Sequence, residues 1–216
     1  CPSGYSALGG QTLNPYGRFD FGTGGSSSGR GASIAANSAA VAVGSETAGS
    51  ILSPSSANSL VGLKPTTGSL SRSGVVPISS TLDTVGPMGR SVADVATLFN
   101  AMTGFDREDL AMPLISEDLQ LIVRDTKLDN RRFGVLRTYS NDALYGRALD
   151  LLSQNGFSLQ EVDFQSERHA RFSELLGAEM KRDLALYLIE YASSEIEVDS
   201  INSLQEFNSI DLENRA

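Results

Sequence analysis

Serine hydroxyls gather in two glycine-rich stretches of the N-terminal half, and their types and spacing suit acyl-transfer chemistry. The first stretch is GGSSSG at residues 24–29, and the second is SETAGS at residues 45–50. Because each glycine costs a helix about 1 kcal/mol, we expect the first stretch to be a tight backbone turn. The second can direct several backbone N–H groups into one concavity, as an acyl-transfer enzyme does to hold an oxyanion. We therefore interpret Ser50, which ends the second turn, as a nucleophile.

The segment between the two turns must position them. Residues 31–43 are nearly all Ala, Ser, Ile, Val and Asn, a composition typical of a closely packed buried helix. This helix is predicted to flow into an apolar strand at residues 39–44. A further helix is predicted at residues 91–103, with Ser91 as its N-cap and Gly104 as its stop.

The C-terminal half has the pattern of strands alternating with helices. We predict a surface excursion at residues 106–130, and then a βαβ unit from a strand at 132–136, a helix at 142–155 and a strand at 158–164. A long amphipathic helix is predicted at residues 172–191. Its interior face would carry the apolar side chains Leu175, Leu176, Met180, Leu184, Tyr187 and Leu188. The acidic tail at 194–213 is predicted to be solvated surface.

The charge of the chain is uneven. Residues 1–105 contain five Lys and Arg and four Asp and Glu, whereas residues 106–216 contain 12 Lys and Arg and 22 Asp and Glu. The net charge of −9 therefore comes from the second half. Neither half has the basic face of a nucleic-acid-binding protein. No apolar run approaches the roughly 18 residues of a membrane span. The single cysteine excludes an internal disulfide and fits a reducing compartment, so we expect a cytoplasmic location.

Beyond these general features, the sequence resembles a known family. The stretches GGSSSG and GSETAGSI are followed in order by VGLKPTTGSLSRSGVVPISSTLDTVGPMGRSVADVATL, and the match runs from about residue 3 to residue 104. This region is similar to the signature region of the amidase signature family, the Ser-cisSer-Lys amidohydrolases. The resemblance implies an α/β fold with a mixed central sheet covered by helices on both faces. The chain would be part of one such domain, with a signature core at 1–105 and an acidic helical and βαβ extension at 106–216.

The resemblance also implies the catalytic residues. Ser50 matches the nucleophile, and Ser26 matches the bridging serine that follows a cis peptide bond, 24 positions earlier. The oxyanion donors would be the backbone N–H groups of Thr47, Ala48, Gly49 and Ser50. The third member of the Ser-Ser-Lys triad, a lysine, lies upstream of the GGSS turn in the family. We therefore expect this chain to be an internal piece of a longer protein, with the lysine outside it and the remaining segments of the same protein as its partner.

Other chemistries fit the residues less well. Of the three lysines present, Lys64 lies in a shared GLKPT motif that we interpret as structural, and Lys127 and Lys181 lie in polar segments. A Ser-His-Asp triad would need His169, the only histidine, which lies in a charged stretch. An N-terminal nucleophile would be Cys1. The stretch GGSSSGRG at residues 24–31 could be a phosphate-binding loop, but it lacks the Gly-Lys-Ser/Thr ending of that motif. The sequence has no pair of histidines and no Cys-x-x-Cys motif that would predict a metal site.

Two of the departures from the pattern Asp-x-Gly-Gly-Ser-Ile-Arg of many members bear on the substrate. Ala48 replaces a glycine and narrows the space beside the oxyanion, and Leu52 replaces an arginine that could pair with an acidic substrate. The variant is more similar to the peptide amidase-like branch than to the A-type subunits of amidotransferases. We therefore expect an amidase that cleaves a neutral or C-terminal carboxamide, a small-molecule substrate, without a cofactor. The alternatives are an A-type amidotransferase subunit that works in a complex and a non-catalytic binding module.

Overall fold

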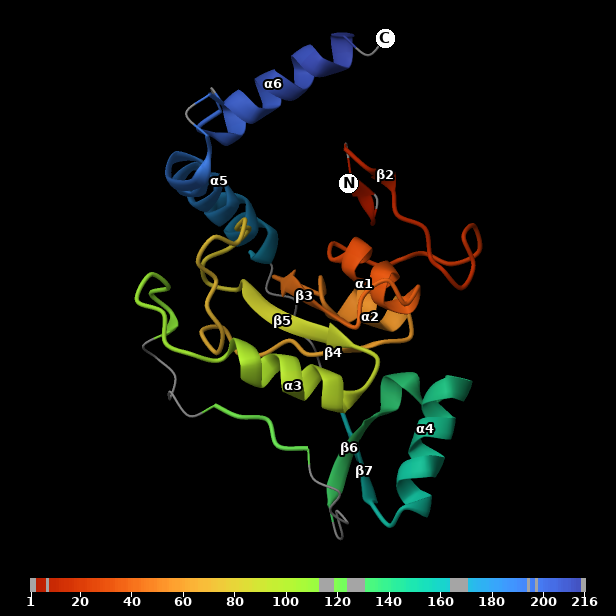
Figure 1. Cartoon of the computed structure of the whole chain (residues 1–216). Helices are drawn as coiled ribbons and strands as arrows, with labels where there is room; N and C mark the ends of the chain where they lie inside the picture. Colours follow the sequence, from red (N-terminus) through yellow and green to blue (C-terminus); the bar gives the residue numbers. More distant parts are fainter. Residues whose placement is uncertain are drawn as a thin grey trace. The chain divides into compact units, whose positions relative to one another are not determined.

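The computed structural model describes residues 3–6, 8–112, 119–123, 131–163, 171–193, 195–196 and 198–214, with side chains at 210–214 left aside. The chain divides into two compact units (Figure 1). The first comprises residues 1–123 with 173–216, and the second comprises residues 124–172. The boundary at residue 105 that the charge distribution suggests stays a prediction.

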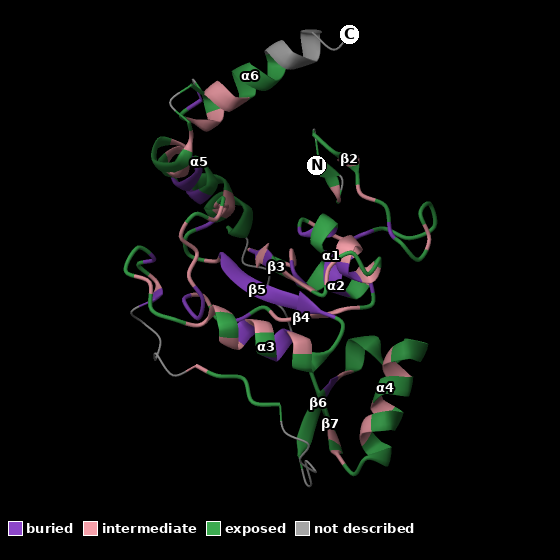
Figure 2. Ribbon diagram, in the orientation of Figure 1, coloured by how far each residue is buried: buried purple, intermediate pink, exposed green. Residues whose placement is uncertain are grey.

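The first unit is built on a three-stranded antiparallel sheet. Its strands are β3 (Val41–Glu46), β4 (Val61–Gly62) and β5 (Thr84–Gly89), in the order β3-β5-β4. Val41 pairs with Gly89 at one end of the β3–β5 ladder, and Glu46 pairs with Thr84 at the other. The central strand β5 is buried along its whole length (Figure 2).

Hydrophobic side chains on the two faces of β5 form two separate cores. Met88 packs with Ile34 and Ile51, whereas Val85 packs with Leu70 and Phe99. Because side chains alternate along a strand, residues three apart lie on opposite faces of the sheet. Figure 1 shows α3 (Val92–Met102) on one side of β5, and α1 (Ser28–Ala35) with α2 (Leu52–Ala57) on the other. Helices thus cover both faces, as expected.

The helices near the two serine-rich turns differ from the sequence prediction. Helix α1 begins at Ser28, inside the predicted first turn, and ends at Ala35, well before residue 43. Strand β3 extends to Glu46 and takes up the first two residues of the predicted second turn. The six-residue helix α2 was not predicted, because its serines and its single proline conceal a helical pattern. Each turn is therefore shorter than its composition suggested.

The predicted helix start at Ser91 is confirmed in detail. The Ser91 side chain accepts a hydrogen bond from the Asp94 N–H at 3.1 Å, and the Asp94 carboxylate accepts one from the Ser91 N–H at 3.0 Å. This reciprocal capping box satisfies two N–H groups that the helix end leaves unpaired. Helix α3 ends at Met102, and its C-cap residue Thr103 directly precedes the predicted stop, Gly104.

The long helix is confirmed as α5 (Phe172–Tyr191), and Leu184 of the predicted interior face is buried, but two acidic residues are buried beside it and the rest of the predicted face is not. Its buried residues are Glu179, Asp183 and Leu184, whereas Leu175 and Met180 are about 40% exposed. The prediction assumed that the apolar stripe faces the interior. The acidic side chains are buried instead because they accept hydrogen bonds from the loop at residues 79–81. The acidic tail contains a helix of its own, α6 (Ile201–Asn214).

The second unit is the predicted βαβ motif. Strands β6 (Arg132–Leu136) and β7 (Ser158–Val162) pair in parallel, with Arg132 opposite Ser158, and α4 (Ala143–Gln154) connects them after the short 3₁₀ helix η2 (Arg137–Tyr139). Asp142 caps α4 by accepting hydrogen bonds from the N–H groups of Leu144 and Tyr145 at 2.8 and 2.9 Å. These side-chain contacts explain why the helix begins there.

Strands β1 (Tyr5–Ser6) and β2 (Gly10–Gln11) form a small antiparallel pair. The α/β class expected from the sequence is confirmed. The expected sheet was a mixed one, with antiparallel and parallel pairs together. Among the described strands, these two kinds of pairing lie in separate sheets: two sheets are antiparallel and one is parallel. No helix within the described ranges is both long enough and apolar enough to span a bilayer.

Candidate active site

The two serine-rich turns are joined by Ser27. Its backbone N–H donates to the carbonyl oxygen of Ser50 at 3.2 Å. Its hydroxyl donates to the Ser45 carbonyl and accepts from the Ser45 N–H, both at 3.3 Å. Ser27 is only 1% exposed, so these bonds are shielded from water. The buried serine beside Ser26 thus ties the first turn to strand β3 and to the last residue of the second turn.

The first turn is held tightly against α2. The peptide bond between Gly25 and Ser26 is cis, as the resemblance implied. Gly24 has a φ of 63°, and a Cβ there would lie 2.6 Å from the Ser53 carbonyl oxygen, so only glycine fits. The Ser28 hydroxyl donates to the Gly24 carbonyl at 2.6 Å. This packing leaves the Ser26 side chain exposed at the surface of the turn.

The second turn, residues 47–50, presents backbone N–H groups that nothing else uses within the described ranges. Glu46, 3% exposed, accepts the N–H groups of Ile51 and Leu52 at 2.7 and 2.9 Å, beyond the turn. The N–H groups of residues 47–50 themselves donate to no acceptor in the part of the chain that the structure describes. Ser50 is half-buried. The turn therefore offers free donors next to a serine hydroxyl.

A carboxylate from the residue just before β5 fixes the start of this turn. The Thr47 hydroxyl donates to one oxygen of Asp83 at 2.5 Å. The other oxygen of Asp83 accepts the N–H groups of Ile78 and Ser79, both at 2.8 Å. Asp83 is 8% exposed, so all three bonds form in a largely dry environment.

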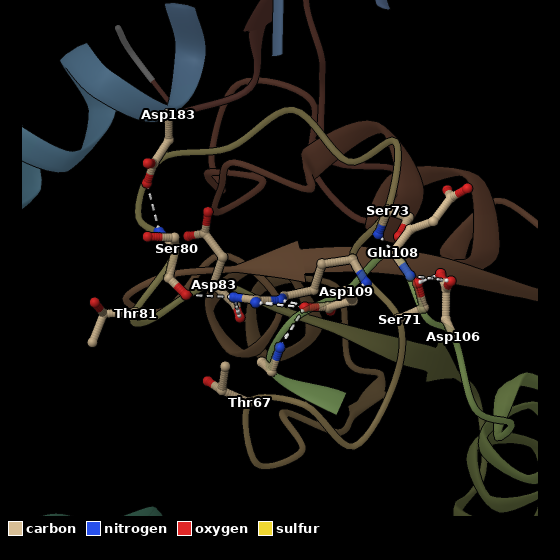
Figure 3. Close-up of polar contacts among 12 residues, drawn as sticks. Thr67, Ser71, Ser73, Ser80, Thr81, Asp83, Asp106, Glu108, Asp109 and Asp183 are labelled. Atoms are coloured by element: carbon tan, nitrogen blue, oxygen red, sulfur yellow. Dashed lines mark hydrogen bonds and ion pairs between the residues drawn. The ribbon is translucent and has the colours of Figure 1, made fainter. Parts of the chain in front are cut away.

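A buried ion pair holds the adjoining loops (Figure 3). The Arg72 guanidinium makes two hydrogen bonds to Asp109, at 2.9 and 2.7 Å, and donates to the Ser80 carbonyl at 2.6 Å. Burial alone would raise the pKa of Asp109, but the hydrogen bonds and charge of Arg72 hold it below its ordinary value. The hydrogen bond to Asp109 in turn raises the pKa of Arg72. Residue 109 was predicted to lie in a polar surface excursion, and that prediction was wrong for it.

Two carboxylates of α5 bind the loop that precedes Asp83. Glu179 accepts hydrogen bonds from the hydroxyls of Ser79 and Thr81. Asp183 accepts the Ser80 N–H at 2.8 Å (Figure 3). Burial would raise the pKa of each carboxyl. The hydrogen bonds, together with the nearby Arg182, instead lower both pKa values below their ordinary range. These contacts are the reason that α5 buries its acidic face.

A hollow lined by charged residues lies away from the two serines. It has a volume of about 320 Å³, lies between the Arg72 turn and α5, and is bordered by Asp109, Asp183, Tyr187 and Tyr191 among others. Neither Ser26 nor Ser50 lines it. The hollow therefore gives no support to a substrate site at the nucleophile.

The alternative nucleophiles and bases gain no support. Lys64 is exposed, with its ammonium 3.4 Å from the Pro65 carbonyl, and Lys181 is exposed on α5. Cys1, Lys127 and His169 lie outside the described residues. Among the residues that the structure describes, no three His, Cys, Asp or Glu side chains gather as metal ligands would.

The sequence interpretation missed the supporting acids Glu46, Asp83 and Asp109. A signal was present for the first two, because residues 1–105 contain only four acidic residues. Glu46, Asp83 and Asp94 each accept backbone N–H groups in the structure. Two of these four acids, Glu46 and Asp83, are thus buried acceptors of backbone N–H groups.

Comparisons with known proteins agree with this architecture. The chain is 43% identical over 145 residues to a probable amidase of Arabidopsis thaliana, and the match covers 65% of this chain and 28% of the relative. It is 35% identical over 186 residues to the A-type subunit of a glutamyl-tRNA(Gln) amidotransferase of Nitratiruptor, covering 82% and 41%. The chain spans less than half the length of these relatives.

Solved structures give the same picture. An amidase family protein from Bacillus anthracis matches with a TM-score of 0.89 and 36% identity, over 100% of this chain and 44% of that one. The peptide amidase of Stenotrophomonas maltophilia matches with a TM-score of 0.85 and 36% identity, over 98% and 45%. The Amidase family model covers residues 2–209. The chain therefore belongs to the Amidase family, the amidase signature enzymes.

Proposed function

We propose that the protein containing this chain is an amidohydrolase that uses Ser50 as its nucleophile and passes through a serine acyl-enzyme. The observation that carries the proposal is the turn at residues 47–50, where N–H groups without acceptors in the described structure lie next to the Ser50 hydroxyl. Donors that are fixed before the reaction stabilise the charge of a tetrahedral intermediate, and each is worth about 3 to 4 kcal/mol in the transition state.

In this mechanism a lysine outside the 216 residues takes the proton of Ser26, and Ser26 takes that of Ser50. Ser50 attacks the carbonyl carbon of the amide, and the N–H groups of Thr47, Ala48, Gly49 and Ser50 bind the oxygen as it becomes negative. The proton then passes to the departing ammonia or amine. Water hydrolyses the ester that remains on Ser50. The side chains named here need no metal or organic cofactor for these steps.

We further propose a neutral or C-terminal carboxamide as the substrate. Leu52, 47% exposed and two residues after Ser50, supplies an apolar surface where many members have an arginine. The likeness to the peptide amidase of Stenotrophomonas maltophilia supports this choice. The remaining segments of the protein would complete the site, and the single cysteine of the chain favours a cytoplasmic location.

The second candidate is an A-type amidotransferase subunit that releases ammonia within a complex. Relatives that are A-type subunits of glutamyl-tRNA(Gln) amidotransferases favour it, with 33% identity over 84% of this chain for that of Campylobacter concisus. Such a protein would hydrolyse glutamine and would purify together with its partners. In contrast, a non-catalytic binding module would do neither and would hydrolyse no carboxamide.

The test compares Ser50→Ala with Ser53→Ala in the full-length gene product. Ser53 is an exposed serine three residues away that makes no side-chain hydrogen bond in the described structure, so it controls for loss of a hydroxyl. Ammonia release from an amidated dipeptide should fall at least about 10⁴-fold in Ser50→Ala and stay unchanged in Ser53→Ala. A fluorophosphonate should label Ser50 alone. Full turnover by a folded Ser50→Ala variant would refute the proposal.

A further inference from the structure

We propose that Asp83 is a positioning residue for this reaction, which acts through the Thr47 hydroxyl to orient the turn at residues 47–50. The inference rests on the proposed function, since it assigns a role in holding the oxyanion donors. Asp83 itself touches no reacting atom in this scheme. Its effect on the reaction passes through the single hydrogen bond of 2.5 Å between the Thr47 Oγ1 atom and Asp83 Oδ1.

The register of the sheet places these two residues opposite each other. Glu46 of β3 pairs with Thr84 of β5 as the last rung of the antiparallel ladder. The next residues outward are Thr47, just after β3, and Asp83, just before β5. The chain leaves the sheet at this point to form the oxyanion turn, so the side-chain bond takes over where the backbone ladder stops. The turn is thereby fixed at its first residue.

Asp83 can serve as an anchor because its own position is fixed. Its second oxygen accepts the Ile78 and Ser79 N–H groups, and its backbone carbonyl accepts the Arg72 guanidinium at 3.3 Å. The loop it belongs to is held in turn by Glu179 and Asp183 of α5. The Thr47 hydroxyl therefore bonds to a carboxylate that cannot move without breaking several other bonds.

The far end of the turn has a matching restraint. Glu46 accepts the N–H groups of Ile51 and Leu52, just after Ser50. Asp83 thus binds the hydroxyl at the start of the turn, and Glu46 binds the two N–H groups that follow its end. The N–H groups of residues 47–50 between them have no acceptor in the described structure. Because oxyanion stabilisation depends on donors that need no reorganisation, loosening one end should slow the chemical step more than it weakens substrate binding.

The experiment compares Thr47→Val with Thr47→Ser in the full-length protein. Valine has the shape of threonine without the hydroxyl, whereas serine keeps the hydroxyl. We expect Thr47→Val to lower kcat for an amidated dipeptide about 10- to 100-fold, with KM changed less than about threefold. Thr47→Ser should recover kcat to within about fivefold of the parent. A peptide aldehyde, which adds the Ser50 hydroxyl to give a hemiacetal oxygen in the oxyanion site, should lose affinity for Thr47→Val by the same factor as kcat/KM.

The matched control is Thr103→Val, which removes a hydroxyl bond of 2.9 Å to the Asn100 carbonyl at the end of α3. It should leave kcat unchanged. Asp83→Asn keeps an oxygen for the two loop N–H groups but changes the partner of Thr47, so it should lose kcat as Thr47→Val does. The double variant should then be no more than about threefold below the worse single variant, because both changes break one bond.

The outcomes separate this inference from the proposed function. If Ser50→Ala is inactive and Thr47→Val keeps kcat within about threefold of the parent, the positioning role is refuted and the amidase proposal stands. An effect of Thr47→Val on KM alone, or an equal loss in Thr47→Ser, also refutes it. If Ser50→Ala remains active, the proposed function fails and this inference fails with it.

Discussion

Removing the Arg72 guanidinium should destabilise the first unit strongly. Its partner Asp109 has a side chain that is only 3% exposed, and Arg72 is itself 15% exposed. Arg72→Met keeps most of the aliphatic stem but leaves the Asp109 carboxylate buried without its cation. Breaking a buried pair in this way costs about 3 to 5 kcal/mol, because the remaining charge is uncompensated. The Ser80 carbonyl, which accepts the guanidinium at 2.6 Å, also loses its partner.

The free energy of unfolding measured by urea denaturation tests this value, provided that the slope with denaturant stays constant. Asp109→Asn should cost less, about 2 kcal/mol, since a neutral amide remains. In the double variant Arg72→Met/Asp109→Leu no charge is left buried, so it should recover part of the loss of Arg72→Met. A loss below about 1 kcal/mol in Arg72→Met, or strictly additive losses in the double variant, would refute the reasoning.

Three further predictions follow from contacts near the turns. Gly24→Ala should lower the free energy of unfolding by more than about 2 kcal/mol, whereas Gly74→Ala should lower it by only about 1 to 2 kcal/mol. Both glycines have a positive φ, but only at Gly24 would the new Cβ meet backbone atoms. Equal losses in the two variants would contradict this reasoning. Glu46→Gln should lower stability by about 1 to 2 kcal/mol, because the two N–H groups lose a charged acceptor, and an unchanged melting temperature would argue against this role. Glu179, whose pKa is lowered from 4.5, contributes stability that is fully present above that pH and is lost as the pH falls through the folded value. The protection of α5 amides, measured relative to their intrinsic exchange rate at each pH, should therefore fall below about pH 4.5, and Glu179→Gln should flatten that dependence.

The local features of this fold could be predicted where a short pattern determines them. The capping box at Ser91 and the βαβ unit follow from residues close in sequence, and both are confirmed. The proposed nucleophile Ser50 also came from a local motif. The burial of acids on α5 could not be predicted, because Glu179 and Asp183 are buried by loop groups about 100 positions away. The spacing of apolar residues in a helix shows which face is hydrophobic. It carries no information about distant hydroxyl groups that stabilise a buried carboxylate by donating hydrogen bonds to it.

The same limit applies to the supports of the candidate site. The Thr47–Asp83 bond spans 36 positions, and it depends on the exact pairing of β3 with β5. The composition of residues 45–50 indicated a turn with several exposed backbone N–H groups. It did not indicate which side chains fix the position of that turn. The motif LDTVGPM contains Asp83, yet the contact of this residue with Thr47 became apparent only with the ladder register.

The pairing of β3 with β5 also links the proposed activity to correct folding. A slip of one residue would exchange the faces of β5 and move Met88 away from Ile34 and Ile51, while Val85 would leave Phe99. The same slip would carry Asp83 out of reach of Thr47. Under the proposed function, misfolded chains would be inactive as well as poorly packed, and the fraction of full-length molecules that a serine-directed probe labels would measure how many chains reached the native register.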